Sequence, residues 1–292
     1  MVLTKDIVTW KIGDRLYDLS HEAMVMGILN VTPDSFFDGG RYSEPYAAVR
    51  RALEMEAEGA AIIDLGGEST RPGADSVSEE EEIKRVLPVL ERMRRRVRCL
   101  ISIDTTKAGV ARVALDAGAD IVNDVSGLKL DPGMIPLLAK RHAAVILMHR
   151  QGTPKSMQEN PAYDDVVLEV RRALLEGLHE ANARGIRRER MVLDPGIGFG
   201  KRVEHNLALL RNCDSLAPHD LPLLIGVSRK SFIGAVQGLP GIDDRFWSGI
   251  ALSAMLRRRG VRIFRVHDVR ATVEAVRMTE AIMHGVREEV AA

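Results

Sequence analysis

The strongest constraint on the fold is an alternation of short apolar runs with longer amphipathic stretches along the 292 residues. Continuous apolar runs of this length are typical of strands in a parallel sheet that is buried on both faces. Eight such strands, nearly all followed by a helix, predict an α/β protein with a closed (β/α)8 TIM barrel, which typically needs ~250 residues. The apolar runs lie at residues 24–30, 61–66, 99–104, 120–123, 143–149, 191–194, 222–227 and 261–266, and helix-like segments include 45–58, 79–97, 107–117 and 163–184.

The first twenty residues precede this alternation and have a pattern of their own. Residues 7–19 alternate around Gly13-Asp14, which predicts a β-hairpin. We expect the hairpin, within residues 1–20, to cover the bottom of a barrel formed by residues 21–285. No linker, repeat or low-complexity tract divides the sequence. Residues 1–292 are therefore predicted to form a single domain.

Charge and hydropathy restrict the class of partner. Lys plus Arg equals Asp plus Glu at 41 each, so no overall basic field attracts nucleic acid or an anionic membrane. No window resembles a membrane span, and the N-terminus lacks the apolar stretch of a signal peptide. The two cysteines, Cys99 and Cys213, have no metal-type spacing and fit a reducing compartment. We expect a cytoplasmic protein that acts on small molecules, without nucleic acid or membrane partners.

Polar side chains follow nearly every apolar run. In a parallel barrel the carboxyl ends of the strands converge on one mouth, where barrel enzymes have their active sites. A single aspartate at such a point could be a helix cap, but eight of eight strand ends is too many for capping alone. We therefore expect one pocket formed by Asn30, Asp64, Asp104, Asn123, His149, Asp194, Ser228 with Lys230, and Arg265 with His267.

Two long loops at the same mouth are predicted to be lids. Residues 30–40 follow the first barrel strand and residues 64–73 follow the second, and both are rich in glycine, proline and polar residues. Proline and paired glycines prevent regular structure from continuing. Loops of this composition at a barrel mouth more often close over substrates than serve as plain connections.

These loops carry a resemblance to a known family. Residues 27–40 and 64–73 are similar to the two signature segments of the dihydropteroate synthases. Further matches lie at residues 102–105, 122–124, 147–149, 151–152, 194–201, 226–231 and 265–269, so the resemblance extends over roughly residues 7–285. The resemblance implies a transferase of folate biosynthesis. Such an enzyme condenses 6-hydroxymethyl-7,8-dihydropterin diphosphate with p-aminobenzoate, giving 7,8-dihydropteroate and pyrophosphate. It also implies inhibition by sulfonamides and a homodimer formed through barrel helices away from the mouth.

The resemblance assigns roles to individual residues. The paired donors on the pterin edge suit a buried carboxylate, and this role falls to Asp194. The whole pterin set is Asp104, Asn123, Met148, Asp194, Lys230 and Arg265, with Met148 and Arg265 on the ring faces. The diphosphate set is Asn30, Ser69, Thr70, Arg71, Arg265 and His267, with Asn30 also binding Mg2+ as an oxygen ligand.

The second substrate and the chemistry complete the implied site. The p-aminobenzoate set is Phe36, Thr70, Pro72, Phe199, Lys230 and Ser231. Asp34 and Arg71 are expected to pair across the two lids. The residues with catalytic roles are Asp104, Lys230, Arg265, His267, Asp34 and Arg71.

Other interpretations fit the sequence less well. The glycine-rich stretch 196–201 is not a nucleotide loop, because Pro195 and Arg202 stand where a phosphate-binding loop needs Gly and Ser or Thr. A folate-dependent methyltransferase domain would use a similar pterin-binding barrel. Methyl transfer, however, needs neither the diphosphate site nor the aminobenzoate site that the two loops suggest. A non-catalytic pterin-binding paralogue predicts damage at functional positions that are intact. Departures from the family pattern at Phe37, Arg150 and Ile197 remove no reacting group.

Overall fold

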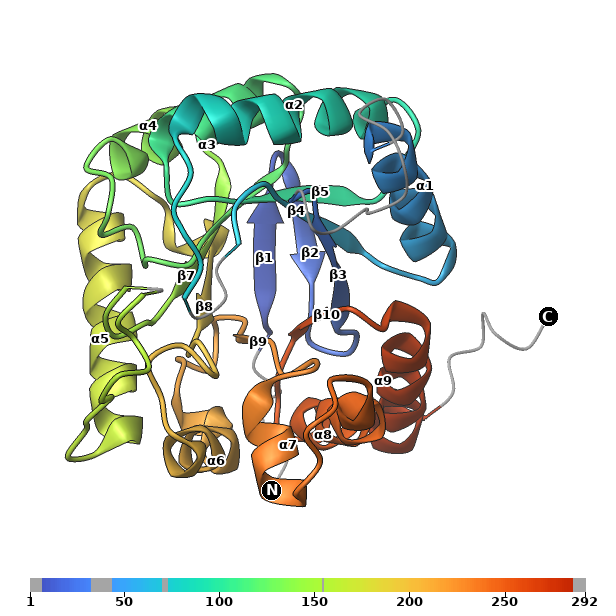
Figure 1. Ribbon diagram of the computed structural model, residues 1–292, viewed down its shortest axis with the longest axis vertical. Helices are drawn as coiled ribbons and strands as arrows, with labels where there is room; N and C mark the ends of the chain where they lie inside the picture. Colours follow the sequence, from blue (N-terminus) through green and yellow to red (C-terminus); the bar gives the residue numbers. More distant parts are fainter. Residues whose placement is uncertain (1–6, 33–43, 70–72, 154, 286–292) are drawn as a thin grey trace.

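The computed structural model describes residues 7–32, 44–69, 73–153 and 155–285. Eight parallel strands form one sheet in the order β8-β7-β6-β5-β4-β3-β10-β9. A parallel bridge between Leu193 and Leu223 joins β8 to the segment before β9 and completes the circle. The predicted (β/α)8 barrel is therefore confirmed (Figure 1). The strands are β3 Met24–Asn30, β4 Ile62–Gly66, β5 Leu100–Asp104, β6 Ile121–Asp124, β7 Ala144–Met148, β8 Met191–Asp194, β9 Leu224–Ile225 and β10 Ile263–Val266.

Helices surround the strands as a ring (Figure 1). They are α1 Glu44–Ala57, α2 Glu79–Arg94, α3 Ala108–Asp116, α4 Met134–Arg141, α5 Val166–Ala183, α6 Val203–Arg211, α7 Ser231–Gln237, α8 Phe246–Arg258 and α9 Val269–His284. Short 3-10 turns are η1 Arg188–Arg190, η2 Cys213–Ser215 and η3 Asp243–Arg245. Within the described ranges, no helix combines the length and the apolar character needed to cross a membrane.

Local sequence determines where these helices begin. The Ser78 hydroxyl accepts a hydrogen bond from Glu81 N (3.2 Å), which satisfies a free amide in the first turn of α2. That turn carries four glutamates, and arginines occupy the last turn. The charges at both ends of α2 therefore interact favourably with the helix dipole. Asp165 caps α5 in the same way by accepting from Val167 N and Leu168 N, both at 3.0 Å.

The predicted hairpin is also confirmed. Strands β1 Thr9–Ile12 and β2 Arg15–Asp18 pair in antiparallel fashion around Gly13, whose φ is +56°. The Trp10 indole is fully buried and donates to Arg190 O (3.0 Å) immediately before β8 begins. Hairpin side chains share one apolar cluster with the first inward residues of the barrel strands. The hairpin therefore covers the amino-terminal end of the barrel, opposite the strand ends that carry polar residues.

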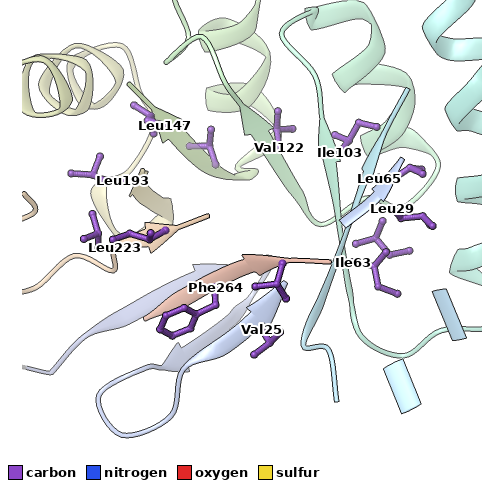
Figure 2. Close-up of a cluster of buried hydrophobic side chains, with 14 of the residues drawn as sticks. Val25, Leu29, Ile63, Leu65, Ile103, Val122, Leu147, Leu193, Leu223 and Phe264 are labelled. Atoms are coloured by element: carbon purple, nitrogen blue, oxygen red, sulfur yellow. The ribbon is translucent and has the colours of Figure 1, made fainter. Parts of the chain in front are cut away.

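Each barrel strand is buried on both faces, as its apolar sequence predicts. Alternate side chains, including Val25, Ile63, Val122 and Leu193, point outward and pack against the helices (Figure 2). The intervening side chains fill the barrel floor above the hairpin. Burial of each such side chain contributes ~1.5–3 kcal/mol, so this double layer provides the rigid support on which the strand ends are fixed.

Candidate active site

The polar strand ends continue the inward phase of the barrel strands. Side chains alternate between faces along a strand, so a residue two positions after an inward floor residue also points into the barrel. Ile62, Ile121, Ile146, Val192 and Ile263 are all floor residues of the inner cluster. The residues two positions further on are Asp64, Asn123, Met148, Asp194 and Arg265. The period that fills the barrel floor thus also brings four of the predicted pterin residues to the mouth, together with Asp64.

Arg265 is the centre of a buried charge network. Its Nε donates to Asp64 Oδ2 (2.6 Å), and its Nη2 donates to Asp104 Oδ2 (2.7 Å). Asn123 Nδ2 donates to the same Asp64 oxygen (3.1 Å). Burial opposes the guanidinium charge, but the two carboxylates outweigh it and raise the pKa of Arg265. Arg265 therefore holds β4 and β5 together electrostatically while it remains a cation.

The same network leaves hydrogen-bonding capacity unused. Asp64 Oδ1, Asp104 Oδ1 and Ser102 Oγ are buried and have no hydrogen-bond partner among the described residues. Burial raises the pKa of Asp104 to about 7, against the opposing effect of Arg265, while Asp64 adds to the increase. Buried polar atoms without partners are costly in a fold and are common where a ligand supplies the missing donors.

Asp194 lies across β7 from this network. Its neighbour in the register is Met148, and its Oδ1 accepts from Gly196 N (2.7 Å), which fixes the carboxylate plane. Burial raises the pKa of Asp194 to about 6, although Lys230 and Arg265 favour the charged form. The geometry gives a fixed buried carboxylate that can present an oxygen to the barrel interior.

Lys230 and Phe199 form a second wall. Lys230 Nζ lies 4.2 Å from the centroid of the Phe199 ring, a cation–π contact. Burial lowers the pKa of Lys230 to about 8, with Arg265 adding to the decrease and Asp194 and Asp104 opposing it. Ser231 begins α7 directly after Lys230 and is exposed. The aromatic ring and the amine therefore lie together.

His267 and the start of α9 lie at the end of β10. The Ser228 hydroxyl contacts both His267 Nδ1 (3.1 Å) and His267 N (3.2 Å), so it orients the imidazole. Arg229 binds Asp268 in a bidentate pair at 2.7 and 3.2 Å. Asp268 precedes α9 but makes no side-chain cap. Because α9 begins just after β10 ends, the first turn of this sixteen-residue helix faces the mouth of the barrel. The positive end of the helix dipole favours a negative group there.

Comparison with known proteins agrees with this geometry. The family model for pterin binding enzymes matches residues 26–267. A dihydropteroate synthase of Escherichia coli K12 is 48% identical over 266 residues, which cover 91% of this chain and 93% of that protein. The chain belongs to the dihydropteroate synthase family. This membership sets aside the methyltransferase-like domain, because the similar curated proteins are dihydropteroate synthases.

Solved structures of the family have the same fold. A Yersinia pestis dihydropteroate synthase, solved as a sulfonamide drug complex, has a TM-score of 0.88 and 43% identity, covering 94% of this chain and 99% of that one. A Xanthomonas albilineans dihydropteroate synthase with 4-aminobenzoic acid also has a TM-score of 0.88, at 41% identity, covering 95% and 99% of the two chains. The likeness extends over nearly the whole barrel in both.

Several residues that the sequence predicts for the active site of this dihydropteroate synthase family member lie in the two loops. Asp34, Phe36, Thr70, Arg71 and Pro72 lie outside the described residues, as does Phe37. Their predicted roles on the two lids therefore stay predictions. Ser69, the last described residue before the second gap, lines a cavity at the mouth.

That cavity has a volume of about 490 Å³ and lies beside the predicted pterin residues rather than among them. Asp104 is the pterin-set residue that reaches it, and Arg150, Lys107 and Glu68 form other parts of the wall. Lys107 Nζ contacts Glu82 Oε2 (2.6 Å) and Glu68, so one cation joins a fully buried glutamate of α2 to the base of the second loop. Arg85 Nη1 also holds Gly67 O (3.0 Å).

A metal site must be tested against the side chains that are present. Asn30 ends β3 beside Gly66, and its Oδ1 lies 3.4 Å from where a Cβ on Gly66 would be. Among the described residues, no group of three or more histidine, cysteine, aspartate or glutamate side chains is placed to hold a metal ion. A magnesium ion at Asn30 would take one amide oxygen from the protein and its other ligands from phosphate and water, and this role stays a prediction.

The structure corrects one expectation and adds functional neighbours. The expectation that every strand-end side chain faces one pocket is wrong for His149, which has the outward phase because Met148 points inward. His149 Nδ1 lies 3.1 Å from Lys201 Nζ, and its ring centroid is 6.2 Å from that of Tyr163. The sequence places Asp64 in the pocket without a specific role. Its inward orientation could be predicted from its spacing of two residues after Ile62. Lys201 lies in the family match at residues 194–201, but the sequence assigns it no role.

Proposed function

We propose that this chain condenses 6-hydroxymethyl-7,8-dihydropterin diphosphate with p-aminobenzoate, releasing pyrophosphate and forming 7,8-dihydropteroate. The observation that carries the proposal is the set of buried carboxylates at the inward strand ends, of which Asp64 and Asp104 each have an oxygen with no hydrogen-bond partner in the described part of the chain. A pterin edge carries paired N–H donors, which a buried strand-end carboxylate such as Asp194 can accept. The similar Xanthomonas albilineans enzyme has been solved in complex with 7,8-dihydropteroate, which supports the assignment.

The pterin would be held by groups on β5, β6, β7, β8 and β10 and in the loop after β9. Asp194 would accept the ring N–H and the exocyclic amine, and Asn123 and Asp104 would bind the rest of the ring edge. Lys230 would donate to the carbonyl side. Arg265 and Met148 would contact the ring faces. Asp104 accepts a hydrogen bond from Arg265 and, in its ionised form, would stabilise the electron-poor ring that develops as the diphosphate leaves.

The departing diphosphate would be neutralised at the other side of the mouth. The groups that would bind the diphosphate are the first turn of α9 and the side chains of Asn30, Ser69, Thr70, Arg71, Arg265 and His267. Bound magnesium would supply charge neutralisation of the phosphate oxygens, with Asn30 as its protein ligand. His267, oriented by Ser228, would donate a hydrogen bond to a phosphate oxygen. No base is needed to start departure, because the reaction depends chiefly on stabilising negative charge.

The amine of p-aminobenzoate would attack the exposed CH2 group from a pocket that closes last. Phe199 and Lys230 already lie together, and Ser231 stands next to Lys230 for the benzoate carboxylate. Phe36, Thr70 and Pro72 would complete the pocket from the lids, and Asp34 with Arg71 would pair across them. Sulfonamides would compete here with p-aminobenzoate, as the drug complex of the similar Yersinia pestis enzyme suggests.

Oligomeric state and compartment are part of the proposal. Trp247 on α8 is 77% exposed and Val236 on α7 is 55% exposed, which supports the expected homodimer through barrel helices. Replacing Trp247 by Glu is expected to give a monomer in light scattering. Cys99 and Cys213 are both free thiols, which supports a reducing, cytoplasmic environment.

A coupled assay for pyrophosphate release tests the function. Dihydropterin diphosphate and magnesium are supplied with and without p-aminobenzoate, and dihydropteroate is measured by chromatography. Pyrophosphate release that depends on p-aminobenzoate and matches the dihydropteroate formed is the expected result. Absence of dihydropteroate with both substrates and magnesium present would overturn the proposal.

A further inference from the structure

Lys201 is a buried lysine that none of the proposed steps uses. The residue is 3% exposed and ends the glycine-rich loop after β8. Its Nζ donates to Gly196 O (2.9 Å) and Phe199 O (3.0 Å) and lies 3.1 Å from His149 Nδ1. A further contact reaches His149 O at 3.5 Å. The loop thus folds around its own terminal amine and is tied through it to the end of β7.

The backbone of this loop leaves little room for another arrangement. Gly196, Gly198 and Gly200 all have positive φ, at +65°, +82° and +62°. A Cβ on Gly196 would lie 1.9 Å from His149 O, and one on Gly200 would lie 2.5 Å from Gln151 O. The loop therefore runs directly against the chain that follows β7. In this conformation the carbonyls of residues 196 and 199 turn toward Lys201, which supplies the donors that they need.

The ring of His149 acts as an acceptor in this arrangement. Burial lowers the pKa of His149 to about 3, and the nearby Lys201 lowers it as well, so the imidazole is neutral. A neutral imidazole has one nitrogen that accepts a hydrogen bond. Lys201 is then the donor to His149 Nδ1 as well as to Gly196 O and Phe199 O. Removing its amine leaves several buried acceptors without a partner at once.

The loop fixed by Lys201 carries or contacts three residues of the proposed site. Phe199 belongs to it, and the Phe199 ring lies 4.2 Å from Lys230 Nζ. A Cβ on Gly198 would lie 3.3 Å from Lys230 Cδ, so the loop also packs along the lysine side chain. Gly196 N donates to Asp194 Oδ1 (2.7 Å). A shift of the loop would therefore move the aromatic wall first, because Asp194 is also held by its own strand.

We propose that Lys201 is a positioning residue that fixes the Phe199 ring beside Lys230 for the aryl amine substrate. It acts through the loop and touches no reacting atom. The inference rests on the proposed function, in which Phe199 and Lys230 form the p-aminobenzoate pocket. It requires that loss of the amine affects the second substrate more than the pterin.

The test compares Lys201→Met with wild type in the full-length protein. Calorimetry measures the Kd for dihydropterin diphosphate, and steady-state assays measure the KM for p-aminobenzoate and kcat. We expect the KM for p-aminobenzoate to rise at least about tenfold, because small displacements of positioned groups have large kinetic effects. The Kd for the pterin should change less than about threefold. Lys140→Met, at an exposed lysine of α4, is the matched control and should behave as wild type.

A second variant keeps the test decisive if the methionine variant does not fold. Lys201→Gln retains a donor in the buried space and should raise the KM for p-aminobenzoate above that of wild type, by less than the roughly tenfold expected of Lys201→Met. A purely structural role would instead lower kcat with the folded fraction and leave KM unchanged. Wild-type KM in a folded Lys201→Gln protein would overturn the positioning role. Absence of synthase activity in wild type would overturn the proposed function instead.

Discussion

Replacing Asp194 by Asn should weaken pterin binding while it stabilises the fold. The Asp194 carboxylate is 6% exposed, and Asn has nearly the same shape. In the variant an amide N–H replaces one of the oxygens that the pterin donors would meet. A mismatched buried polar pair costs ~1–3 kcal/mol. Since 1.4 kcal/mol is a factor of ten, the Kd for dihydropterin diphosphate should rise roughly tenfold to hundredfold.

The stability change has the opposite sign because burial raises the pKa of Asp194 to about 6, above its ordinary value of 3.8. An acid with a raised pKa stabilises the folded state below pH 3.8, where it is neutral, and loses that contribution as the pH rises through 6. At pH 7 the ionised carboxylate therefore costs about 3 kcal/mol, at 1.36 kcal/mol per pKa unit. Asn mimics the neutral acid and avoids this cost. The variant should be more stable at pH 7, and its advantage should shrink between pH 6 and pH 4.

Two measurements decide the matter. Urea unfolding at pH 7 and pH 4.5 gives the difference in the free energy of unfolding between Asp194→Asn and wild type. Calorimetry across the same pH range should show wild-type pterin affinity falling as the pH drops through 6, because the protonated acid no longer accepts two bonds. Unchanged pterin affinity in the variant would remove Asp194 from the pterin site. A variant that is less stable than wild type at pH 7 would refute the electrostatic reasoning.

Three further predictions concern other parts of the mouth. Lys107→Met should lower the free energy of unfolding by ~3–5 kcal/mol in urea titrations, because it leaves the fully buried Glu82 without its cation; a loss below 1 kcal/mol would contradict this. EDTA should abolish turnover but spare binding of the pterin without diphosphate, whereas full activity in metal-free buffer would exclude the role of Asn30. Calorimetry should detect p-aminobenzoate binding only after pterin diphosphate or pyrophosphate is present, and Arg71→Ala should weaken only that second step. Tight binding to the free protein would exclude this order.

Much of the site could be predicted because one period governs both core and function. The spacing of two residues from Ile62 to Asp64, or from Val192 to Asp194, is visible in the sequence once the strands are recognised. Apolar side chains fill the floor, and the next inward position reaches the mouth. The same rule shows why His149 was misplaced. It follows the inward Met148 by one residue, so it must leave the barrel interior.

Contacts between loops could not be predicted in the same way. The amine of Lys201 reaches carbonyls of its own loop and a ring on the neighbouring strand, and no periodicity encodes that closure. The strand expected at residues 222–227 shortens to Leu224–Ile225. Its flanks contain Pro222, which has no N–H for a ladder bond. Pro222 O and Leu223 O nevertheless accept bonds from β8 and β10, so the barrel closes with little regular strand.

The two ends of the barrel show how the fold supports a costly site. At the mouth, burial raises the pKa of Asp104 to about 7 and lowers that of Lys230 to about 8, so the protein holds charges where they are disfavoured. At the floor, the hairpin and the first inward side chains form a cluster of buried apolar residues. Trp10 extends this cluster and ties the hairpin to the chain before β8. Because floor and mouth belong to the same strands, apolar burial at the floor offsets the free-energy cost of the buried polar groups at the mouth.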